Sequence, residues 1–336
     1  MDALFAADLA ARFDTPLYAY DLTAVARRTR ELRAALPEGA RLYHSYKANP
    51  LPALAEEIRR EGGWAEVTSE GELGAARAAG QDLGQALFGG PGKTPREIQA
   101  ALAAGVRWFS CESWRDLDRL AAAALAAGVV IQLLLRVNPA EAPNARLAMT
   151  GVESQFGFDE AQLLTPEAAS RLRLPGVQVR GVHVYFGTQV ASVEAITENT
   201  RRALETAERL ERALGFVCSV VNAGGGFPWP YAHHAPAPDL SGLRAALTAV
   251  WQASPLHETA ELWFEAGRFL TASSGTLITQ VMDVKISRTR TFVILDTGIH
   301  HLGGMAGLGR LPRSAVSFEN LSRQSETEMT ADIVGP

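Results

Sequence analysis

Short apolar segments alternate with helix-like segments from residue 41 to residue 267, and this alternation limits what the chain can fold into. Several of the apolar segments are rich in β-branched residues or apolar throughout, as strands buried on both faces require. Eight strand–helix units in about 225 residues are typical of a (β/α)8 barrel, which takes ~250 residues; an open doubly wound sheet is the alternative. The expected strands are Leu42–Tyr46, Trp64–Thr68, Gln85–Phe88, Arg107–Cys111, Val129–Val137, Arg180–Phe186, Val217–Asn222 and Glu261–Glu265.

The segments between these strands have apolar residues at helical spacing. In Glu194–Leu214 they form one stripe, with glutamates and arginines on the opposite side. Ala53–Arg60 and Trp114–Ala127 have the same pattern, and Gly128 stands where a glycine would end the second of them. We therefore expect an α/β fold in which helices cover the outside of a parallel barrel.

The two ends of the chain do not follow this alternation. Thr15–Asp21 has the pattern of a strand that precedes the barrel. After Thr271 the predicted strands Leu277–Ile286 and Thr291–Leu295 follow one another without helices. We expect residues 1–25 to contain a strand that joins a β-rich C-terminal domain at residues 271–336, and the barrel to take residues 26–270.

Composition argues against several classes of partner. The net charge is −5 and the chain has no long run of Lys or Arg, which disfavours nucleic acid and anionic membranes. The two cysteines, Cys111 and Cys218, lie in apolar segments and are expected to be free thiols in a reducing compartment. No segment approaches 18 uninterrupted apolar residues. We expect a soluble, cytoplasmic protein.

Polar residues recur where the predicted strands end, which is the end at which barrels build their active sites. Lys47 follows the first strand and Glu265 ends the eighth, and closure of a barrel makes these two strands neighbours. Three glycines, Gly224–Gly226, follow the seventh strand, and Gly267 and Arg268 follow the eighth, where barrels bind phosphate. Other strands carry Glu66, Glu112, Arg136 and His183 at or near their ends.

Each of these residues alone has a simpler explanation. A lysine after a strand is usually a surface residue, three glycines often form an ordinary turn, and a histidine between two valines is more often a core residue than a catalyst. Their coincidence at one end of one barrel favours a functional site. A lysine, a glycine-rich anion cradle and a buried carboxylate are the groups that a pyridoxal 5'-phosphate (PLP) enzyme requires. We expect no metal site.

The motifs, taken in order, resemble those of the fold-type III PLP-dependent decarboxylases, the group of diaminopimelate, ornithine and arginine decarboxylases. The resemblance covers nearly the whole chain. The matching segments are Thr15–Asp21, Tyr46–Asn49, Glu70–Leu73, Arg136–Pro139, Phe156–Phe158, His183, Gly224–Gly226, Glu265–Arg268 and Asp296–Gly298.

The resemblance implies the role of each candidate residue. Lys47 would bind PLP as a Schiff base, and an amino acid would lose its carboxylate through a quinonoid intermediate. Glu265 would pair with the pyridinium nitrogen, and His183 would stack on the ring. Glu66 and Arg136 would line the site. The phosphate would be bound by Gly187, Thr188, Gly224, Gly225, Gly226, Gly267 and Arg268.

The chain also departs from the family pattern. Ala266 replaces the usual proline, and Thr188 replaces a common serine but keeps its hydroxyl. The family continues beyond a Val-Gly-Pro such as Val334–Pro336 into a segment with a catalytic cysteine and then a tyrosine. We therefore expect an incomplete C-terminal domain, and a site that is completed across a homodimer in the resembling enzymes. The chain alone is then expected to bind PLP and to decarboxylate poorly.

The substrate is less closely defined than the family. Ala65–Val67, Glu70–Leu73, Gly89–Lys93 and His300–His301 resemble a subgroup that serves natural-product and siderophore pathways. The substrate would be a diaminopimelate-like or basic amino acid, or an amino acid linked to an acyl carrier protein. An amino-acid racemase on the same barrel and a non-catalytic PLP-barrel homologue that acts as a binding partner are the alternatives.

Overall fold

A computed structural model describes residues 3–139, 154–190, 192–230, 236–302, 317–321 and 329–336. The chain divides into two compact units. One unit, which contains the barrel, takes Leu22–Trp229 and Pro238–Ser273; the other, which is rich in β-strands, takes Met1–Asp21, Pro230–Ala237 and Ser274–Pro336.

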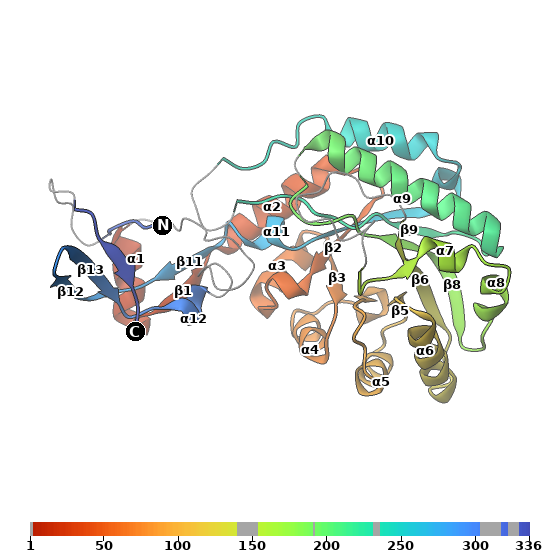
Figure 1. The fold of residues 1–336 in the computed structure, drawn as a ribbon, viewed down its shortest axis with the longest axis horizontal. Helices are drawn as coiled ribbons and strands as arrows, with labels where there is room; N and C mark the ends of the chain where they lie inside the picture. Colours follow the sequence, from red (N-terminus) through yellow and green to blue (C-terminus); the bar gives the residue numbers. More distant parts are fainter. Residues whose placement is uncertain (1–2, 140–153, 191, 231–235, 303–316, 322–328) are drawn as a thin grey trace. The chain divides into compact units, whose positions relative to one another are not determined.

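Eight parallel strands close into a barrel in the first unit, as the sequence predicts (Figure 1). Around the barrel the order is β2, β3, β4, β5, β6, β8, β9 and β10, and β10 pairs with β2 to close it. A two-residue strand, β7 (Phe158–Asp159), adds to β6 and was not predicted. The barrel strands are β2 (Arg41–Ser45), β3 (Trp64–Val67), β4 (Leu87–Phe88), β5 (Trp108–Cys111), β6 (Ile131–Asn138), β8 (Val177–Val184), β9 (Val220–Asn222) and β10 (Glu261–Ala266).

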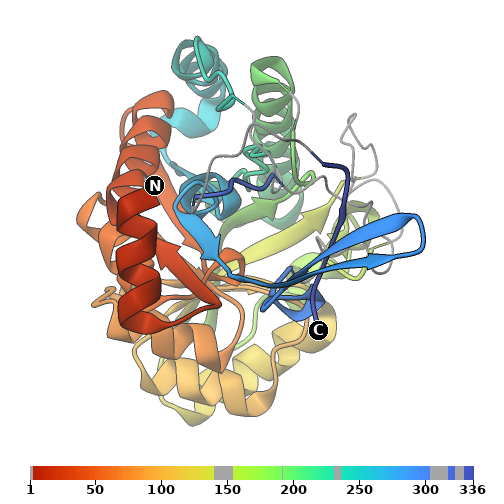
Figure 2. The ribbon, with the colours of Figure 1, turned by 90° about the vertical axis from the view of Figure 1, so that its left-hand side faces the viewer.

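Helices surround these strands (Figure 2). The three helices predicted with bounds form to within one residue at each end, and Gly128 has the left-handed φ of +66° that a glycine after a helix adopts. The helices of this unit are α2 (Leu22–Ala35), α3 (Pro52–Arg60), α4 (Glu70–Ala78), α5 (Pro95–Ala103), α6 (Trp114–Ala126), α7 (Glu160–Leu163), α8 (Ala168–Arg171), α9 (Val193–Leu214), α10 (Leu243–Ala253) and α11 (Arg268–Thr271), with 3-10 turns η1 (Tyr46–Ala48), η2 (Leu83–Gln85) and η3 (Pro255–Glu258).

The barrel interior has an apolar lower layer. The indole of Trp263 is fully buried, with its ring centroid 4.8 Å from that of Tyr43 and 5.0 Å from that of Trp108. Leu87, Leu134 and Val220 complete the buried part of this cluster from β4, β6 and β9. Because side chains alternate between the two faces of a strand, the next inward residues lie nearer the C-terminal ends of the strands. Those residues are polar: Ser45, Glu66, Ser110, Arg136, His183, Asn222 and Glu265.

The described part of the β-rich unit contains two sheets. β1 (Leu17–Tyr20) pairs antiparallel with β11 (Gly275–Ile278), which confirms that the N-terminal strand joins the C-terminal β-structure. β13 (Arg290–Leu295) lies between β12 (Val281–Ser287) and β14 (Asp332–Val334). Two helices, α1 (Ala3–Phe13) and α12 (Ile299–Leu302), complete the described part of the unit.

One predicted strand was wrong. Leu277–Ile286 was expected to be continuous, but the chain leaves one sheet after Ile278 and enters the other at Val281. Asp296 explains the break, because its Oδ1 accepts hydrogen bonds from the Thr279 hydroxyl and from the backbone N–H of Gln280. The pattern of hydrophobic residues in the sequence does not reveal a side-chain cap of this kind.

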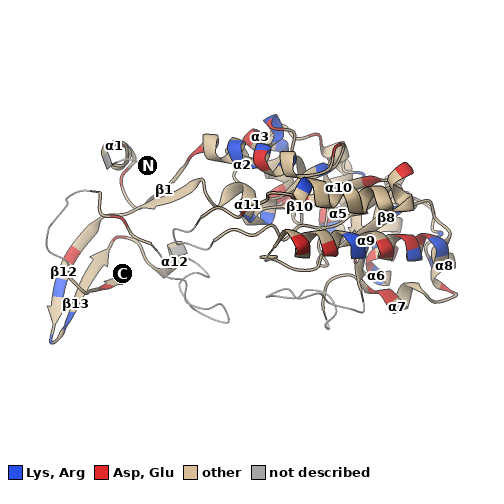
Figure 3. Ribbon diagram, turned by 90° about the horizontal axis from the view of Figure 1, so that it is seen from above, with Lys and Arg blue, Asp and Glu red and all other residues tan. Residues whose placement is uncertain are grey.

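The surface carries charges of both signs. Arginines and glutamates both lie along α2, α3 and α9 (Figure 3), and Glu198 on α9 forms ion pairs with Arg201 and Arg202. Both cysteines are buried and free, as predicted. None of the described helices is long and apolar enough to cross a membrane.

Candidate active site

Lys47 lies two residues after the end of β2, in η1. Its side chain is 57% exposed, and its Nζ is 3.9 Å from Oε2 of Glu66, a buried residue of β3. The negative charge of Glu66 raises the pKa of Lys47. Among the described residues, Oε2 of Glu66 has no hydrogen-bond partner. The pair combines an accessible amine with a buried carboxylate that stabilises its charged form.

Glu265 lies in the barrel interior on β10, the neighbour of β2. Its Oε1 accepts a hydrogen bond of 2.8 Å from Nδ2 of Asn222. Burial raises the pKa of Glu265, and the nearby charge of Glu66 raises it further. Its ionised form is therefore incompletely compensated, and a cationic group bound beside it would stabilise that form.

His183 lies beside Glu265 on β8 and is only 1% exposed. Its Nε2 is 3.2 Å from Oε1 of Glu265, without the alignment of a hydrogen bond, and its Nδ1 shares a hydrogen bond of 2.9 Å with Oγ of Ser110. Burial lowers the pKa of His183 well below its ordinary value, and Arg136 lowers it further. The imidazole is therefore neutral and enclosed. Its stacking on a cofactor ring stays a prediction.

The three glycines after β9 form a loop that packs against neighbouring backbone. A Cβ on Gly225 would lie 1.7 Å from the carbonyl oxygen of Glu265, and one on Gly226 would lie 2.3 Å from that of Gly187. Gly224 accepts a hydrogen bond of 2.7 Å from the backbone N–H of Glu265. The loop can approach the strand ends this closely only because it has no side chains.

The loop after β8 lies next to the glycine loop, because Val190 N–H donates to the carbonyl of Gly226 at 2.9 Å. This second loop contains Gly187 and Thr188. The hydroxyl of Thr188 accepts a hydrogen bond of 3.3 Å from Nη1 of Arg268 in α11. Two loops and a guanidinium therefore meet at the ends of β8, β9 and β10.

Gly267 allows α11 to begin close to the lysine segment. A Cβ at this position would lie 2.6 Å from the Cβ of Ala48 and 3.2 Å from the carbonyl oxygen of Ser45. Arg268 follows immediately, so the closeness of Gly267 to η1 keeps the guanidinium and Lys47 in the same part of the barrel.

Arg136 lies on β6 between two aromatic rings. Its guanidinium carbon is 5.4 Å from the ring centroid of Phe156 and 5.6 Å from that of Tyr185, within the range of cation–π attraction. Its Nη1 is 3.8 Å from Oε1 of Glu112. The other oxygen of Glu112 accepts a hydrogen bond of 2.9 Å from Gly157 N–H. Glu112 thereby connects Arg136 to the segment that carries Phe156.

A fully buried ion pair lies behind Glu112 and was not predicted. Nζ of Lys93 donates to Oδ2 of Asp116 at 2.8 Å and to the carbonyl of Gly90 at 2.6 Å. The same carboxylate oxygen accepts the backbone N–H of Glu112 at 3.1 Å. The pair fixes the backbone from which Glu112 reaches Arg136.

The predicted site residues all lie at the C-terminal ends of barrel strands, on β2, β3, β6, β8, β9 and β10 or on the segments that follow them. Sequence reasoning missed Ser110, Tyr185 and the Lys93–Asp116 pair. Alternation along β5, in which Trp108 faces the core, could have indicated Ser110.

This arrangement fits PLP. The carboxylate of Glu265 has a raised pKa and suits a cationic ring nitrogen. Glycine loops with the Arg268–Thr188 pair suit a phosphate group. Lys47 provides an amine at the same end of the barrel. The sequence contains two other lysines: Lys93 is fully buried in an ion pair with Asp116, and Lys285 lies on β12 in the other unit.

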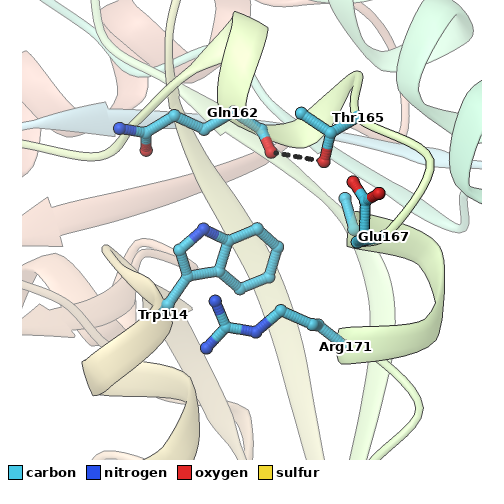
Figure 4. Close-up of a pocket in the computed structure, with 6 residues that line it drawn as sticks. Trp114, Gln162, Thr165, Glu167 and Arg171 are labelled. Carbon is cyan, nitrogen blue, oxygen red and sulfur yellow. Dashed lines mark hydrogen bonds between the residues drawn. The ribbon is translucent and has the colours of Figure 1, made fainter.

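A separate hollow of about 300 Å³ lies among α6, α7 and α8 (Figure 4). Arg171 stacks on the indole of Trp114 there, with its guanidinium carbon 4.4 Å from the ring centroid. None of the predicted site residues lines this hollow. Its lining residues are Trp114, Gln162, Thr165, Glu167, Ala168 and Arg171.

A closed parallel barrel with a lysine, a buried carboxylate and an anion cradle at one end defines the class of PLP-binding barrels. The family model described as "Pyridoxal-dependent decarboxylase, pyridoxal binding domain" matches residues 22–272. The chain therefore belongs to the pyridoxal-dependent decarboxylase family.

Named relatives agree with this assignment. The chain is 32% identical to L-glutamyl-[BtrI acyl-carrier protein] decarboxylase of Niallia circulans, over 93% of this chain and 73% of the relative. It is 30% identical to diaminopimelate decarboxylase of Aquifex aeolicus, over 98% of this chain and 76% of the relative. The structure of Helicobacter pylori diaminopimelate decarboxylase complexed with L-lysine matches with a TM-score of 0.76 and 25% identity, covering 87% of this chain and 73% of that one. The predicted fold, cofactor and class of enzyme are confirmed.

Proposed function

We propose that this chain is a PLP-dependent amino-acid decarboxylase in which Lys47 attaches the cofactor through Nζ and Glu265 holds its ring nitrogen protonated. The observation that carries these roles is the pairing of β2 with β10, which brings the accessible amine and the buried carboxylate to one end of the barrel. When bound, PLP supplies the electron sink that stabilises the electron pair left by loss of carbon dioxide.

The residues around the lysine prepare its amine. Lys47 must lose a proton before Nζ can act as a nucleophile. Glu66 lies 3.9 Å away and raises the pKa of Lys47, so the resting amine is protonated. Glu66 is therefore proposed to hold the ammonium group in position through Oε2 until the amine reacts.

The remaining site residues orient the bound molecules. Gly187, Thr188, Gly224–Gly226, Gly267 and Arg268 are proposed to hold the phosphate, because a guanidinium and close-packed backbone are the groups that bind this anion. Arg136, fixed by Glu112 between two rings, is proposed to supply positive charge beside the substrate. His183 is proposed to position the carboxylate of Glu265, whose Oε1 lies 3.2 Å from its Nε2.

The substrate is proposed to be an amino acid, either free or carried on an acyl carrier protein. Diaminopimelate decarboxylases support the first form and the glutamyl carrier-protein decarboxylase supports the second. His300 and His301, which resemble the natural-product subgroup, precede a glycine-rich stretch (residues 303–309) that lies outside the described residues.

We also propose that the protein is a cytoplasmic homodimer. Its two free thiols agree with a reducing compartment. Analytical sedimentation would test the dimer.

Release of carbon dioxide tests the function. Chain reconstituted with PLP is given free diaminopimelate, lysine, ornithine, arginine or glutamate, and in parallel glutamate attached to a carrier protein. Mass spectrometry of the amine product separates decarboxylation from racemisation, which leaves the mass unchanged. Decarboxylation of any one substrate, even at the low rate expected of the chain alone, supports the proposal, whereas racemisation or PLP binding with no detectable decarboxylation of any substrate favours the two alternatives.

A further inference from the structure

Tyr185 is an aromatic residue at the site to which no role has been assigned. It follows β8 directly, two positions after His183, so alternation along the strand turns both side chains toward the barrel interior. His183 lies level with Asn222 and Arg136 in the sheet register. Tyr185 lies one step nearer the C-terminal end, where Lys47 lies.

The two side chains differ in how much of their surface a ligand can reach. His183 is 1% exposed and is enclosed by Ser110 and Glu265, whereas Tyr185 is partly exposed. A hydrogen bond to a ring nitrogen needs only one accessible oxygen, which a nearly buried carboxylate such as Glu265 can provide. A contact with the face of a cofactor ring needs an open aromatic surface, and the enclosed imidazole does not offer one.

Contacts of Tyr185 place it among the proposed cofactor-binding groups. A Cβ on Gly224 would lie 2.8 Å from Cδ2 of Tyr185, so the glycine loop packs against the edge of the tyrosine ring. Thr188, three positions further along the chain, accepts a hydrogen bond from Arg268. Arg136 lies 5.6 Å from the ring centroid.

We infer that Tyr185, rather than His183, is the aromatic side chain that packs against the pyridine ring of PLP, and that His183 positions Glu265 one layer deeper. This inference rests on the proposed function. Burial raises the pKa of Tyr185, so the phenol stays neutral, and the packing of Gly224 against the ring edge holds the ring beside the phosphate loops.

Affinity for PLP in the absence of the covalent bond tests the inference. In a Lys47→Ala background, binding is measured by equilibrium dialysis and by the circular dichroism that the bound cofactor acquires. Tyr185→Leu is expected to weaken binding roughly tenfold or more and to change the dichroism, because an aromatic contact with a ring contributes on that scale. Tyr185→Phe keeps the ring and is expected to stay within about threefold. Tyr18→Leu makes the same change in the other unit and should have no effect.

His183→Gln tests the positioning role by a different readout. It is expected to keep the dichroism of the bound cofactor and to shift the pH at which the absorption of that cofactor changes, because the neighbour of Glu265 has changed. If Tyr185→Leu binds PLP as tightly as its parent, or if His183→Gln alone changes the dichroism, the inference is overturned. If the Lys47→Ala parent binds no PLP, the proposed function itself is contradicted, and the inference with it.

Discussion

Oε1 of Glu265 lies between two interior side chains, 2.8 Å from Nδ2 of Asn222 and 3.2 Å from Nε2 of His183. The carboxylate therefore has a fixed position at the base of the site, one strand away from the segment that carries Lys47. Its burial and its raised pKa make its ionisation depend on what binds beside it.

Glu265→Gln should lower the rate of decarboxylation with PLP still bound. The amide keeps the shape of the side chain but cannot stabilise a protonated ring nitrogen by charge. Removal of a catalytic electrostatic partner typically costs about 10²–10³-fold in rate. Single-turnover kinetics of the PLP-loaded variant measure the chemical step. Asp283→Asn, an acid-to-amide change on β12 in the other unit, is the control, and an unchanged rate in Glu265→Gln would remove the carboxylate from the mechanism.

Glu265 should also make the stability of the cofactor-free chain depend on pH. Its pKa is raised in the fold, so its contribution is fully present below the ordinary glutamate value of ~4.3 and is lost as pH rises through the raised value. Glu265→Gln has no group that titrates here, so it does not lose this contribution. Between pH 5 and pH 8 the free energy of unfolding of the variant should therefore rise relative to that of the natural chain by on the order of 1–3 kcal/mol, measured by denaturant unfolding at both pH values. If the free energies of unfolding of the two proteins change with pH in the same way, the raised pKa of Glu265 is contradicted.

Gly225→Ala should disrupt the site or the fold. The added Cβ would lie 1.7 Å from the carbonyl oxygen of Glu265, a backbone atom that cannot move without displacing β10. Such overpacking costs about 1–3 kcal/mol or more. Gly92→Ala is the matched control, because no atom lies within 4 Å of its added Cβ. Thermal melts and PLP titration of both variants decide the point; equal behaviour would show that the loop does not need this closeness.

Breaking the buried Lys93–Asp116 pair should destabilise the barrel. Lys93→Met leaves the Asp116 carboxylate buried without its main partner, at a cost of about 3–5 kcal/mol. Changing both residues, Lys93→Met with Asp116→Leu, should restore part of this loss, since the buried carboxylate is gone and Arg119, its other partner, is partly exposed. Lys285→Met on exposed β12 is the control. Denaturant unfolding measures all three, and a single variant as stable as the natural chain would show that the pair contributes nothing.

The sequence predicted the repeated parts of this structure well. All eight barrel strands form where apolar runs predicted them, because strands buried on both faces leave a strong pattern. Lys47, Glu265 and the three glycines could be predicted as one site, because barrel closure brings the first and last strands together. These predictions needed only the order of elements along the chain.

Depth within the barrel could not be predicted in the same way. His183 and Tyr185 face the same interior, but the pattern does not say that one is enclosed by Ser110 and the other partly open. The sheet change at Thr279 depends on the side chain of Asp296, which lies 17 positions away in sequence. Both features arise from contacts between elements, and single-sequence periodicity does not contain them.

Covalent attachment of PLP tests the central claim most directly. The chain contains three lysines, so reduction of the PLP-loaded protein with borohydride followed by peptide mass mapping has three possible outcomes. The account predicts the pyridoxyl group on the peptide that contains Lys47, its loss in Lys47→Ala and its retention in Lys285→Ala. A pyridoxyl group on Lys93 or Lys285, or persistent labelling of Lys47→Ala, would contradict the account.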